Sequence, residues 1–478
     1  MYRTNLSYIP KGEKKMKKLI SLFTVISLVL SMLVMGALSV SAAWDGTTVA
    51  TGFASGTGTE ADPFVIATPE QLAYLAQSVK AHTTYEGKYF ALGANIDLGG
   101  KEWTPIGVFY TSNTDKETYA DNAPFMGSFD GKGYTISGLS ITKDDFGTRL
   151  GIFGDVVTTG YIKNVVIENA SVNPNTTSTG RYAGALAGCI SGGTVSGILV
   201  KESVTVSGTA SVGGVSGRFI GNCDAKYLVN YAAVNGTVAD SSMFTGGITG
   251  VVGGGAKLSY AVNYGKVTGL GAFVGGVTGI TGGDSGTGTL DNVANCGEVY
   301  YATETAKSWY IGGIAGCFGR DTGITYDNTN LYNLGKVSAH AGNTKACVGE
   351  IVGESRKGTV NVTKAYSIDI EGKDAAGKNS VAPVLNDVVN KTEAEIKVFV
   401  DAIVATINSN MVTPPAAPET TTPSAPETTA PSAPETTAPT TTPVQPSNPN
   451  TGDASAIILA AVCVTGLAAV IVTKKKER

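Results

Sequence analysis

The sequence predicts an all-β fold in which the chain coils as a parallel β-helix, a solenoid of stacked turns. The first observation is a short unit of the form apolar–Gly–small–apolar–small–Gly, which returns every 29 to 37 residues. A recurrence of this length is typical of stacked-repeat architectures, in which loops absorb the variation in length. The seven copies, of which the first is abbreviated, occupy residues 150–154, 183–188, 212–217, 245–250, 274–279, 311–316 and 348–353.

Glycine content is the second observation. The chain holds 62 glycines, and a glycine costs roughly 0.5–1 kcal/mol relative to alanine inside a helix or strand. The repeats are therefore not expected to form isolated helices or hairpins. Glycine is useful where one backbone passes close to another, or where φ is positive.

The third observation is an asparagine followed two positions later by glycine. This marker occurs at Asn263, Asn295 and Asn333, with an irregular relative at residues 234–238. Asparagine and glycine together suit a left-handed turn residue before a short strand. Each repeat is thus expected to hold three short strands, separated by a glycine turn and an Asn–Gly turn, with the asparagines stacked from turn to turn.

The first 43 residues are predicted to be a signal peptide. Lysines follow Met16, where translation is expected to begin, and residues 19–40 are apolar. Small residues then offer a cleavage site at Ala42 or Ala43. An uncleaved membrane anchor is the alternative, because the apolar run is long.

Residues 44–149 are predicted to form the N-terminal cap and the first turns of the coil. Thr68 followed by Pro69 is a typical helix start. A short helix beginning there would close the open end of the coil and protect its edge. Its apolar face would be formed by Leu72, Leu75, Ala76 and Val79.

The Gly-rich coil itself is expected over residues 150–380. Residues 391–407 then place apolar side chains at helical spacing, so the segment 381–412 is predicted to be a C-terminal helical cap. A helix that binds a partner is the alternative. Residues 413–447 are rich in Pro and Thr and low in complexity, which predicts an extended, disordered stalk.

The last segment, 448–478, has three parts. It opens with Asn448, Pro449, Asn450, Thr451 and Gly452. An apolar run at 454–472 follows, which is long enough to span a bilayer. The basic residues at 474–478 are expected to stay inside the cell.

This order of parts resembles a sortase sorting signal of Gram-positive bacteria. The resemblance implies that a sortase cuts between Thr451 and Gly452 and transfers the Thr carboxyl group to an amine of the wall, so sortase and peptidoglycan are expected partners. Asn448 stands where leucine is usual in that family, which leaves the sortase class open. A simple C-terminal membrane anchor, before or without sorting, is the alternative.

Residues 125–139 (FMGSFDGKGYTISGL) carry a second resemblance. Together with residues 61–64, 95–98 and 151–154, they resemble bacterial cell-surface proteins with GLUG-type repeats, over residues 58–362. The resemblance implies a pectin-lyase-like β-helix and a role as an adhesin or as surface architecture. Some GLUG repeats accompany zinc IgA peptidases, but this chain has no HExxH motif, so that activity is not expected.

Composition narrows the classes of partner and cofactor. Only 15% of residues are charged and the net charge is −4, which favours neither nucleic acid nor an anionic membrane as a partner. The two histidines, His82 and His340, are far apart, and there is no CxxC pair. No metal and no other cofactor is therefore expected.

Two sets of side chains could carry function. Enzymes that cut polysaccharides need acids, or a base with Ca²⁺, on one face of adjacent turns, whereas the charges in these repeats are scattered. They are Arg218, Asp240, Asp284, Asp291, Glu298, Arg320, Asp321 and Glu354. Tyrosines could stack on sugar rings, although packing between turns is the favoured interpretation; they are Tyr260, Tyr264, Tyr300, Tyr301, Tyr310, Tyr326 and Tyr332.

These observations predict a non-enzymatic adhesin or ligand-display module on the outside of a Gram-positive-type bacterium. Its expected partner is a host glycan or matrix ligand, and no ligand-binding residue is predicted. One alternative is a polysaccharide lyase or hydrolase on the same scaffold. The other is a purely structural wall protein.

Overall fold

The computed structural model describes residues 42–110, 121–143, 145, 147–176, 178–283, 286–304, 309–368, 376–379 and 383–415. Most of the predicted signal peptide, most of the stalk and the whole sorting signal lie outside these residues. Within them, no helix combines the length and the apolar character that a membrane crossing needs. The predicted apolar run at 454–472 lies outside the described residues.

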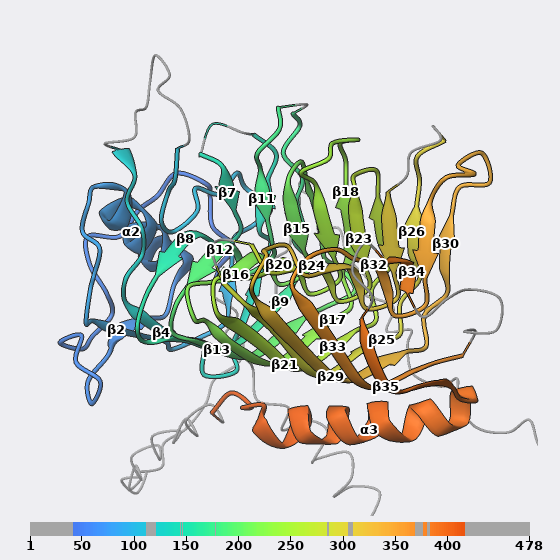
Figure 1. Ribbon diagram of the computed structural model, residues 1–478. Helices are drawn as coiled ribbons and strands as arrows, with labels where there is room; N and C mark the ends of the chain where they lie inside the picture. Colours follow the sequence, from blue (N-terminus) through green and yellow to red (C-terminus); the bar gives the residue numbers. More distant parts are fainter. Residues whose placement is uncertain are drawn as a thin grey trace, which may run out of the picture. The chain divides into compact units, whose positions relative to one another are not determined.

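The described chain coils into a parallel β-solenoid of about seven turns, with two helices (Figure 1). Four sheets run along the coil, and all pairs between the named strands are parallel. The all-β solenoid predicted from the repeats is confirmed. The main sheet contains β1 (Phe64–Ile66), β2 (Tyr89–Leu92), β3 (Ile96–Asp97), β4 (Ser128–Asp130), β5 (Thr135–Ser137), β9 (Tyr161–Glu168), β13 (Thr194–Val200), β17 (Asp224–Asn230), β21 (Ala256–Asn263), β25 (Gly288–Asn295), β29 (Thr325–Asn333), β33 (Thr359–Ser367) and β35 (Val384–Asn390).

Three narrower sheets complete each turn. The second sheet holds β6 (Ser140–Ile141), β10 (Ser171–Val172), β14 (Thr205–Gly208), β18 (Ala233–Gly236), β22 (Val267–Gly269), β26 (Val299–Tyr301) and β30 (Val337–Ala339). The third holds β7 (Arg149–Leu150), β11 (Tyr182–Ala183), β15 (Ser211–Gly213), β19 (Phe244–Gly246), β23 (Phe273–Gly275), β27 (Tyr310–Gly312) and β31 (Cys347–Gly349). The fourth holds β8 (Phe153–Val157), β12 (Ala187–Ser191), β16 (Ser216–Ile220), β20 (Thr249–Val252), β24 (Thr278–Thr281), β28 (Ala315–Phe318), β32 (Val352–Ser355) and β34 (Ala376–Asn379).

Each turn therefore contains four strands, where the sequence predicted three. The prediction did not separate the fourth-sheet strand from the main-sheet strand that follows it. Gly282 and Gly283, between β24 and β25, have φ of 93° and 89°. Such a conformation is strained for residues with a side chain, so the two glycines turn the chain and divide the segment into two strands.

A left-handed residue in the middle of the main-sheet strands bends them. Asn292 in β25 and Asn330 in β29 have φ of 54°. The same register position holds Tyr227 and Tyr260, also with positive φ. The left-handed residue interrupts the regular alternation of inward and outward side chains. Val195 and Ile198 of β13 therefore both point into the core, although they lie three positions apart.

The glycines of the repeated unit lie where two backbones pass close together. A Cβ on Gly275 would lie 2.0 Å from the carbonyl oxygen of Thr278, and one on Gly312 would lie 2.0 Å from that of Ala315. Real side chains do not tolerate such separations. Close approach, rather than positive φ, is thus the reason for glycine at this corner.

A ladder of buried asparagine side chains runs along the corner between the main and second sheets. The Nδ2 atoms of Asn230, Asn263 and Asn295 each donate to the Oδ1 atom of the asparagine one turn on, at 2.9, 2.9 and 3.0 Å. The last acceptor is Asn333, and all four side chains are fully buried. Stacking of the asparagines is confirmed. The left-handed turn residue predicted at the Asn–Gly marker is wrong, since the left-handed residue lies three positions before each ladder asparagine.

The sequence-based assignment of the ladder residue before Asn263 is also wrong. The sequence marker assigned the irregular copy to residues 234–238, but Asn235 lies within β18. The structural equivalent is Asn230, whose Nδ2 donates to the carbonyl oxygen of Ala232 at 3.1 Å. Asn263 makes the same contact to Gly265 at 2.8 Å.

The third residue of the repeated unit is a glycine in four copies, at 214, 247, 276 and 313, and it leaves room for this ladder. A Cβ on Gly276 would lie 2.3 Å from the Cγ atom of Asn295. In the last turn, Glu350 replaces that glycine and Ser367 replaces the asparagine. The Glu350 Oε2 accepts from Ser367 Oγ at 2.9 Å and from Asn333 Nδ2 at 3.3 Å, so a carboxylate ends the ladder without an unpaired amide.

Two helices complete the described structure. Helix α2 (Pro69–Lys80) begins with a capping box at Thr68 and buries its predicted apolar face in the coil's core. Helix α3 (Glu393–Asn410) has a second capping box at Thr392. Both helices were predicted.

The position of α3 corrects its predicted role as a cap. The helix lies lengthwise along the outer face of the main sheet, where it contacts β17, β21, β25, β29 and β33 (Figure 1). The segment 381–412 also contributes β35, which pairs with β33. Apolar side chains follow one face of α3 along its length. They pack against a row of outward-facing apolar side chains on the main sheet.

Replacing Asn295 with alanine is expected to lower the free energy of unfolding by about 3 kcal/mol, because it removes one hydrogen-bond partner from each of the buried amides of Asn263 and Asn333 and two of the ladder's bonds. The measurement is the guanidinium midpoint, followed by circular dichroism. Asn361→Ala is the matched control, since Asn361 bonds Asp327 near the surface. Equal shifts for the two variants would contradict a structural role for the ladder.

Candidate functional site

An outward column of apolar side chains on the main sheet determines where α3 and the groove beside it lie. The column follows the register of the sheet and contains Val166, Leu199, Val229, Val262, Ala294, Tyr332 and Tyr366. Helix α3 covers the part from Tyr366 back to Val229 with its buried side chains Ile396, Val400, Ile403 and Ile407. Helix α3 runs from the last turns back toward the first, opposite to the direction in which the coil advances.

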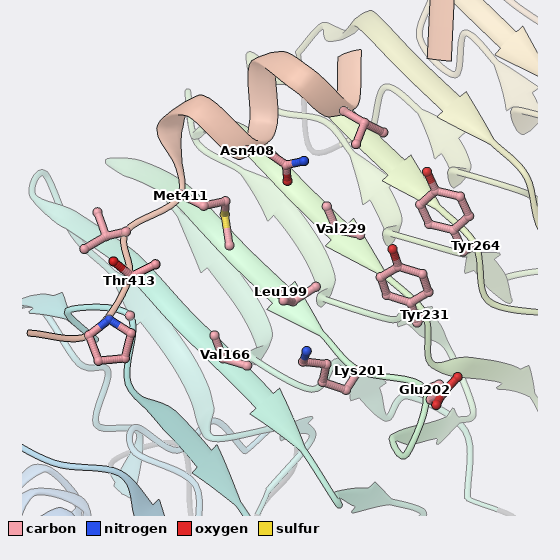
Figure 2. A pocket seen from close by; sticks show the side chains of 14 residues that line it. Val166, Leu199, Lys201, Glu202, Val229, Tyr231, Tyr264, Asn408, Met411 and Thr413 are labelled. Carbon is pink, nitrogen blue, oxygen red and sulfur yellow. The ribbon is translucent and has the colours of Figure 1, made fainter. Parts of the chain in front are cut away.

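The uncovered part of the column is the floor of a surface groove of about 560 Å³ (Figure 2). Val166 and Leu199 line the floor, and Val229, at the end of the part that α3 covers, borders it. Met411 and the segment 412–414 form one wall of the groove. This segment passes close to Gly133, where a Cβ would lie 2.3 Å from the Val412 carbonyl oxygen. A volume of this size falls within the range of roughly 300–1,000 Å³ found for ligand pockets.

The opposite rim of the groove carries a pair of stacked tyrosines. The rings of Tyr231 and Tyr264 lie 4.7 Å apart with an interplanar angle of 7°, and Tyr231 is 41% exposed. Lys201 and Glu202 follow on the same rim, one turn earlier (Figure 2). The groove thus joins an apolar floor to an aromatic and polar rim.

Burial favours the uncharged form of the two phenols. It raises the pKa of Tyr264 to about 12, and the neighbouring Cys296 and Tyr231 add to the rise. Burial also raises the pKa of Tyr231 from its ordinary value. A phenol is uncharged at neutral pH even without this rise, so each hydroxyl can donate a hydrogen bond as well as accept one.

Most of the tyrosines named from the sequence pack between turns, as favoured. Tyr301, Tyr326 and Tyr332 are almost fully buried, and Tyr310 continues a ring stack from Phe273. Tyr231 was not named, although Asn230-Tyr231-Ala232 matches Asn263-Tyr264-Gly265 in two positions of three. The alanine in place of glycine hid that copy of the marker.

The charged residues named from the sequence lie on different faces. Asp291 is on the outer face of the main sheet near Lys257, at 3.8 Å, and Glu298 pairs with Lys266 at 2.8 Å in the next corner. Glu354 is buried in the fourth sheet, 3.8 Å from Arg356. Arg218 lies in β16 of the same sheet, Asp240 and the pair Arg320 and Asp321 lie in loops, and Asp284 lies outside the described residues.

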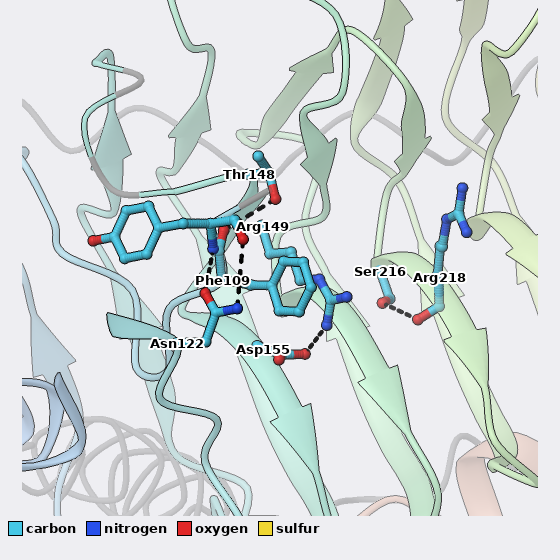
Figure 3. A network of polar contacts seen from close by, with 8 residues as sticks. Phe109, Asn122, Thr148, Arg149, Asp155, Ser216 and Arg218 are labelled. Carbon is cyan, nitrogen blue, oxygen red and sulfur yellow. Dashed lines mark hydrogen bonds and ion pairs between the residues drawn. The ribbon is translucent and has the colours of Figure 1, made fainter. Parts of the chain in front are cut away.

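A polar network at the corner between the third and fourth sheets was not predicted (Figure 3). The Arg149 guanidinium bonds the buried carboxylate of Asp155 and lies 3.6 Å from the centre of the Phe109 ring. Burial raises the pKa of Asp155 from its ordinary value, and the adjacent guanidinium opposes that rise. Because the charges of Arg149 and Asp155 are paired with each other in this corner, we interpret the network as structural.

The same corner continues as a stack of aromatic rings. Phe244, Phe273 and Tyr310 are spaced by 5.5 and 5.4 Å. Arg320 lies over Phe244 at 5.2 Å, and Arg356 lies over Phe273 at 5.5 Å. The arginines cover the outer edge of the stack, which supports packing between turns here.

Metal-ligating side chains do not gather in the part of the chain that the structure describes, where no group of three or more His, Cys, Asp or Glu residues could hold an ion. His340 lies 3.8 Å from Glu304 in a loop after β30, whereas His82 follows α2. Among the described residues, no disulfide joins any of the five cysteines from Cys189 to Cys347.

The predicted processing residues are only partly described. Ala42 and Ala43 are exposed, immediately before the buried Trp44. Asn448, Pro449, Asn450, Thr451 and Gly452 lie outside the described residues. Cleavage at either place stays a prediction.

Releasing α3 is expected to expose the thiol of Cys296. This side chain packs beneath α3, and burial raises its pKa to about 12. Ile403→Asp would place an unpaired carboxylate in that interface, which costs several kcal/mol. Labelling of Cys296 by a thiol reagent at neutral pH should then become at least about tenfold faster, as measured by mass spectrometry of the labelled peptide.

Val398→Asp is the matched control for this experiment. Val398 lies on the same helix but is 66% exposed, so its replacement should leave the labelling rate unchanged. Equal rates in Ile403→Asp and the unmodified chain would contradict the packing of α3 on the sheet.

Comparisons with known proteins assign no family to this chain. No family model matches the chain. The chain is 33% identical over 142 residues to halomucin from Haloquadratum walsbyi; the match covers 27% of this chain and 1% of halomucin, so the chain spans about one hundredth of that relative. A Bacteroides ovatus protein of solved structure, described as a candidate immunoglobulin A1 protease, has a TM-score of 0.48 and 20% identity, over 73% of this chain and 90% of that one.

Proposed function

We propose that this chain is a cell-wall-anchored surface protein whose coil binds a ligand outside the cell without converting it. The observation that carries the proposal is the groove on the outer face of the main sheet, at the point where residues 412–414 leave the coil toward the Pro/Thr-rich segment. A groove on a hydrogen-bonded scaffold presents fixed side chains to a ligand and so lowers the entropic cost of binding.

The order of segments supports display outside the cell. A predicted signal peptide, a coil, a Pro/Thr-rich stalk and a sorting-type signal follow one another. The GLUG-type resemblance over 58–362 and the similarity to halomucin are both compatible with a surface protein. Sortase and peptidoglycan are the proposed partners for attachment, and the chain is proposed to act as a sortase substrate rather than as an enzyme.

Attachment to the wall is tested with the whole chain expressed in a sortase-positive Gram-positive host. The chain should be released from the wall fraction by a muramidase, and Thr451→Ala should move it to the membrane fraction. Thr441→Ala, in the stalk, is the control and should not change the distribution. Retention of wall attachment in Thr451→Ala would contradict sorting at this position.

Ligand binding is tested on the same cells with panels of labelled glycans and host matrix proteins. Saturable binding of one class, with the bound glycan recovered at its original length, is the expected result. Shortened glycans would contradict a non-enzymatic role and favour a polysaccharide-cleaving enzyme. Lack of binding to every member would contradict ligand binding and favour a structural wall protein.

A further inference from the structure

The tyrosine stack beside the groove ends abruptly at Tyr231. Lys201, Tyr231 and Tyr264 each follow the register-paired residues Val200, Asn230 and Asn263 of consecutive main-sheet strands. They therefore occupy the same position in three successive turns. One face of the Tyr231 ring is covered by Tyr264, and the turn before it supplies a lysine instead of a third ring.

The uncovered face of Tyr231 borders the groove. The side chain is 41% exposed, and it lines the groove together with Lys201 and Leu199 (Figure 2). A flat ligand lying against this face would extend the stack by one layer, in line with the coil. Its other surface would meet the apolar side chains of Leu199 and Val229.

Polar groups lie beside this face of Tyr231. Lys201 and Glu202 lie on the sheet side, and Asn408 lies on the α3 side. The lysine and the glutamate carry opposite charges next to each other, so the rim has no net charge and favours an uncharged ligand. The amide of Asn408 offers both a donor and an acceptor.

We propose that the groove binds a neutral pyranose unit of an extracellular polysaccharide, stacked on the open face of Tyr231. This inference rests on the proposed ligand-binding function and names the ligand class of the same groove. A pyranose ring has an apolar face of C–H groups and a rim of hydroxyls. The first matches the tyrosine face, and the second matches Lys201, Glu202 and Asn408.

A second occupant has to be distinguished by experiment. Residues 412–414 already line the groove, so the following Pro/Thr-rich segment could fold back into it. The groove favours a sugar over this segment, because charged and amide groups converge on its aromatic end. The Pro/Thr-rich segment carries glutamates at 419, 427 and 435, and a rim without net charge offers their carboxylates no balancing cation, whereas a neutral sugar needs none.

The test uses cells that display the whole chain, with fluorescent cellotetraose and chitotetraose as neutral probes and tetragalacturonate as the anionic probe. At least one neutral probe should bind saturably, and tetragalacturonate should not bind. Tyr231→Ala should weaken binding of the neutral probe by about tenfold or more, because stacking on an aromatic ring is lost. Tyr231→Phe should retain most of the affinity, since it keeps the aromatic face.

Tyr300→Ala is the matched control, because Tyr300 lies in the second sheet, away from the groove, and is also partly exposed. It should bind like the unmodified chain. Binding of the neutral probe that survives Tyr231→Ala would overturn the assignment of this groove while leaving a ligand-binding function intact. Binding to none of the neutral probes, or their displacement by a synthetic peptide of residues 416–447, would overturn it as well.

Discussion

The structure depends on the hydrogen-bonded register between successive turns. A turn of this coil buries its core only against its neighbours, so a shift of one residue would turn each inward side chain outward. The buried amide ladder from Asn230 to Asn333 fixes the register at one corner, because an asparagine out of step would lose both of its neighbours. The glycines opposite the ladder are needed in the same register, because a Cβ at their positions would collide with the asparagine side chains.

The same register aligns the outward side chains and thereby produces the groove. The apolar column on the main sheet is longer than α3, and the helix covers its later turns. The first part of the column, at Val166 and Leu199, is left to form the groove floor. The groove therefore exists because α3 covers only part of the apolar column. Its aromatic rim lies at the asparagine corner, because Tyr231 and Tyr264 come directly after two ladder asparagines.

The sequence predicted features that depend on local chemistry. Repeat spacing predicted the number of turns, the cap residue Thr68 marks the observed start of α2, and the apolar spacing over 391–407 predicted α3. It could not show which asparagines are left-handed, because Asn292 and Asn295 lie three residues apart in one strand and only the bend distinguishes them. It also could not place α3, since an apolar stripe indicates that a helix is covered but not by what.

Other features depend on contacts between distant residues. In the last turn, Glu350 and Ser367 occupy the positions that a glycine and an asparagine hold in the earlier turns. Their pairing is apparent only in the structure, where the corner brings Ser367 Oγ to 2.9 Å from Glu350 Oε2. The groove likewise joins residues from the first turns to the end of α3. Tyr231 could have been found by aligning all residues that follow ladder asparagines, but the ladder itself had to be seen first.

Hydrogen exchange of the backbone amides that follow the ladder tests most directly whether the corner holds the turns together. The amides of Tyr264, Cys296 and Leu334 donate to carbonyl oxygens of the preceding turn at 2.7, 2.7 and 2.8 Å. If the register is one cooperative feature, the three amides should exchange slowly and at a common rate, set by opening of the whole coil. Rates that differ widely from turn to turn would show that each turn opens by itself and would contradict this account.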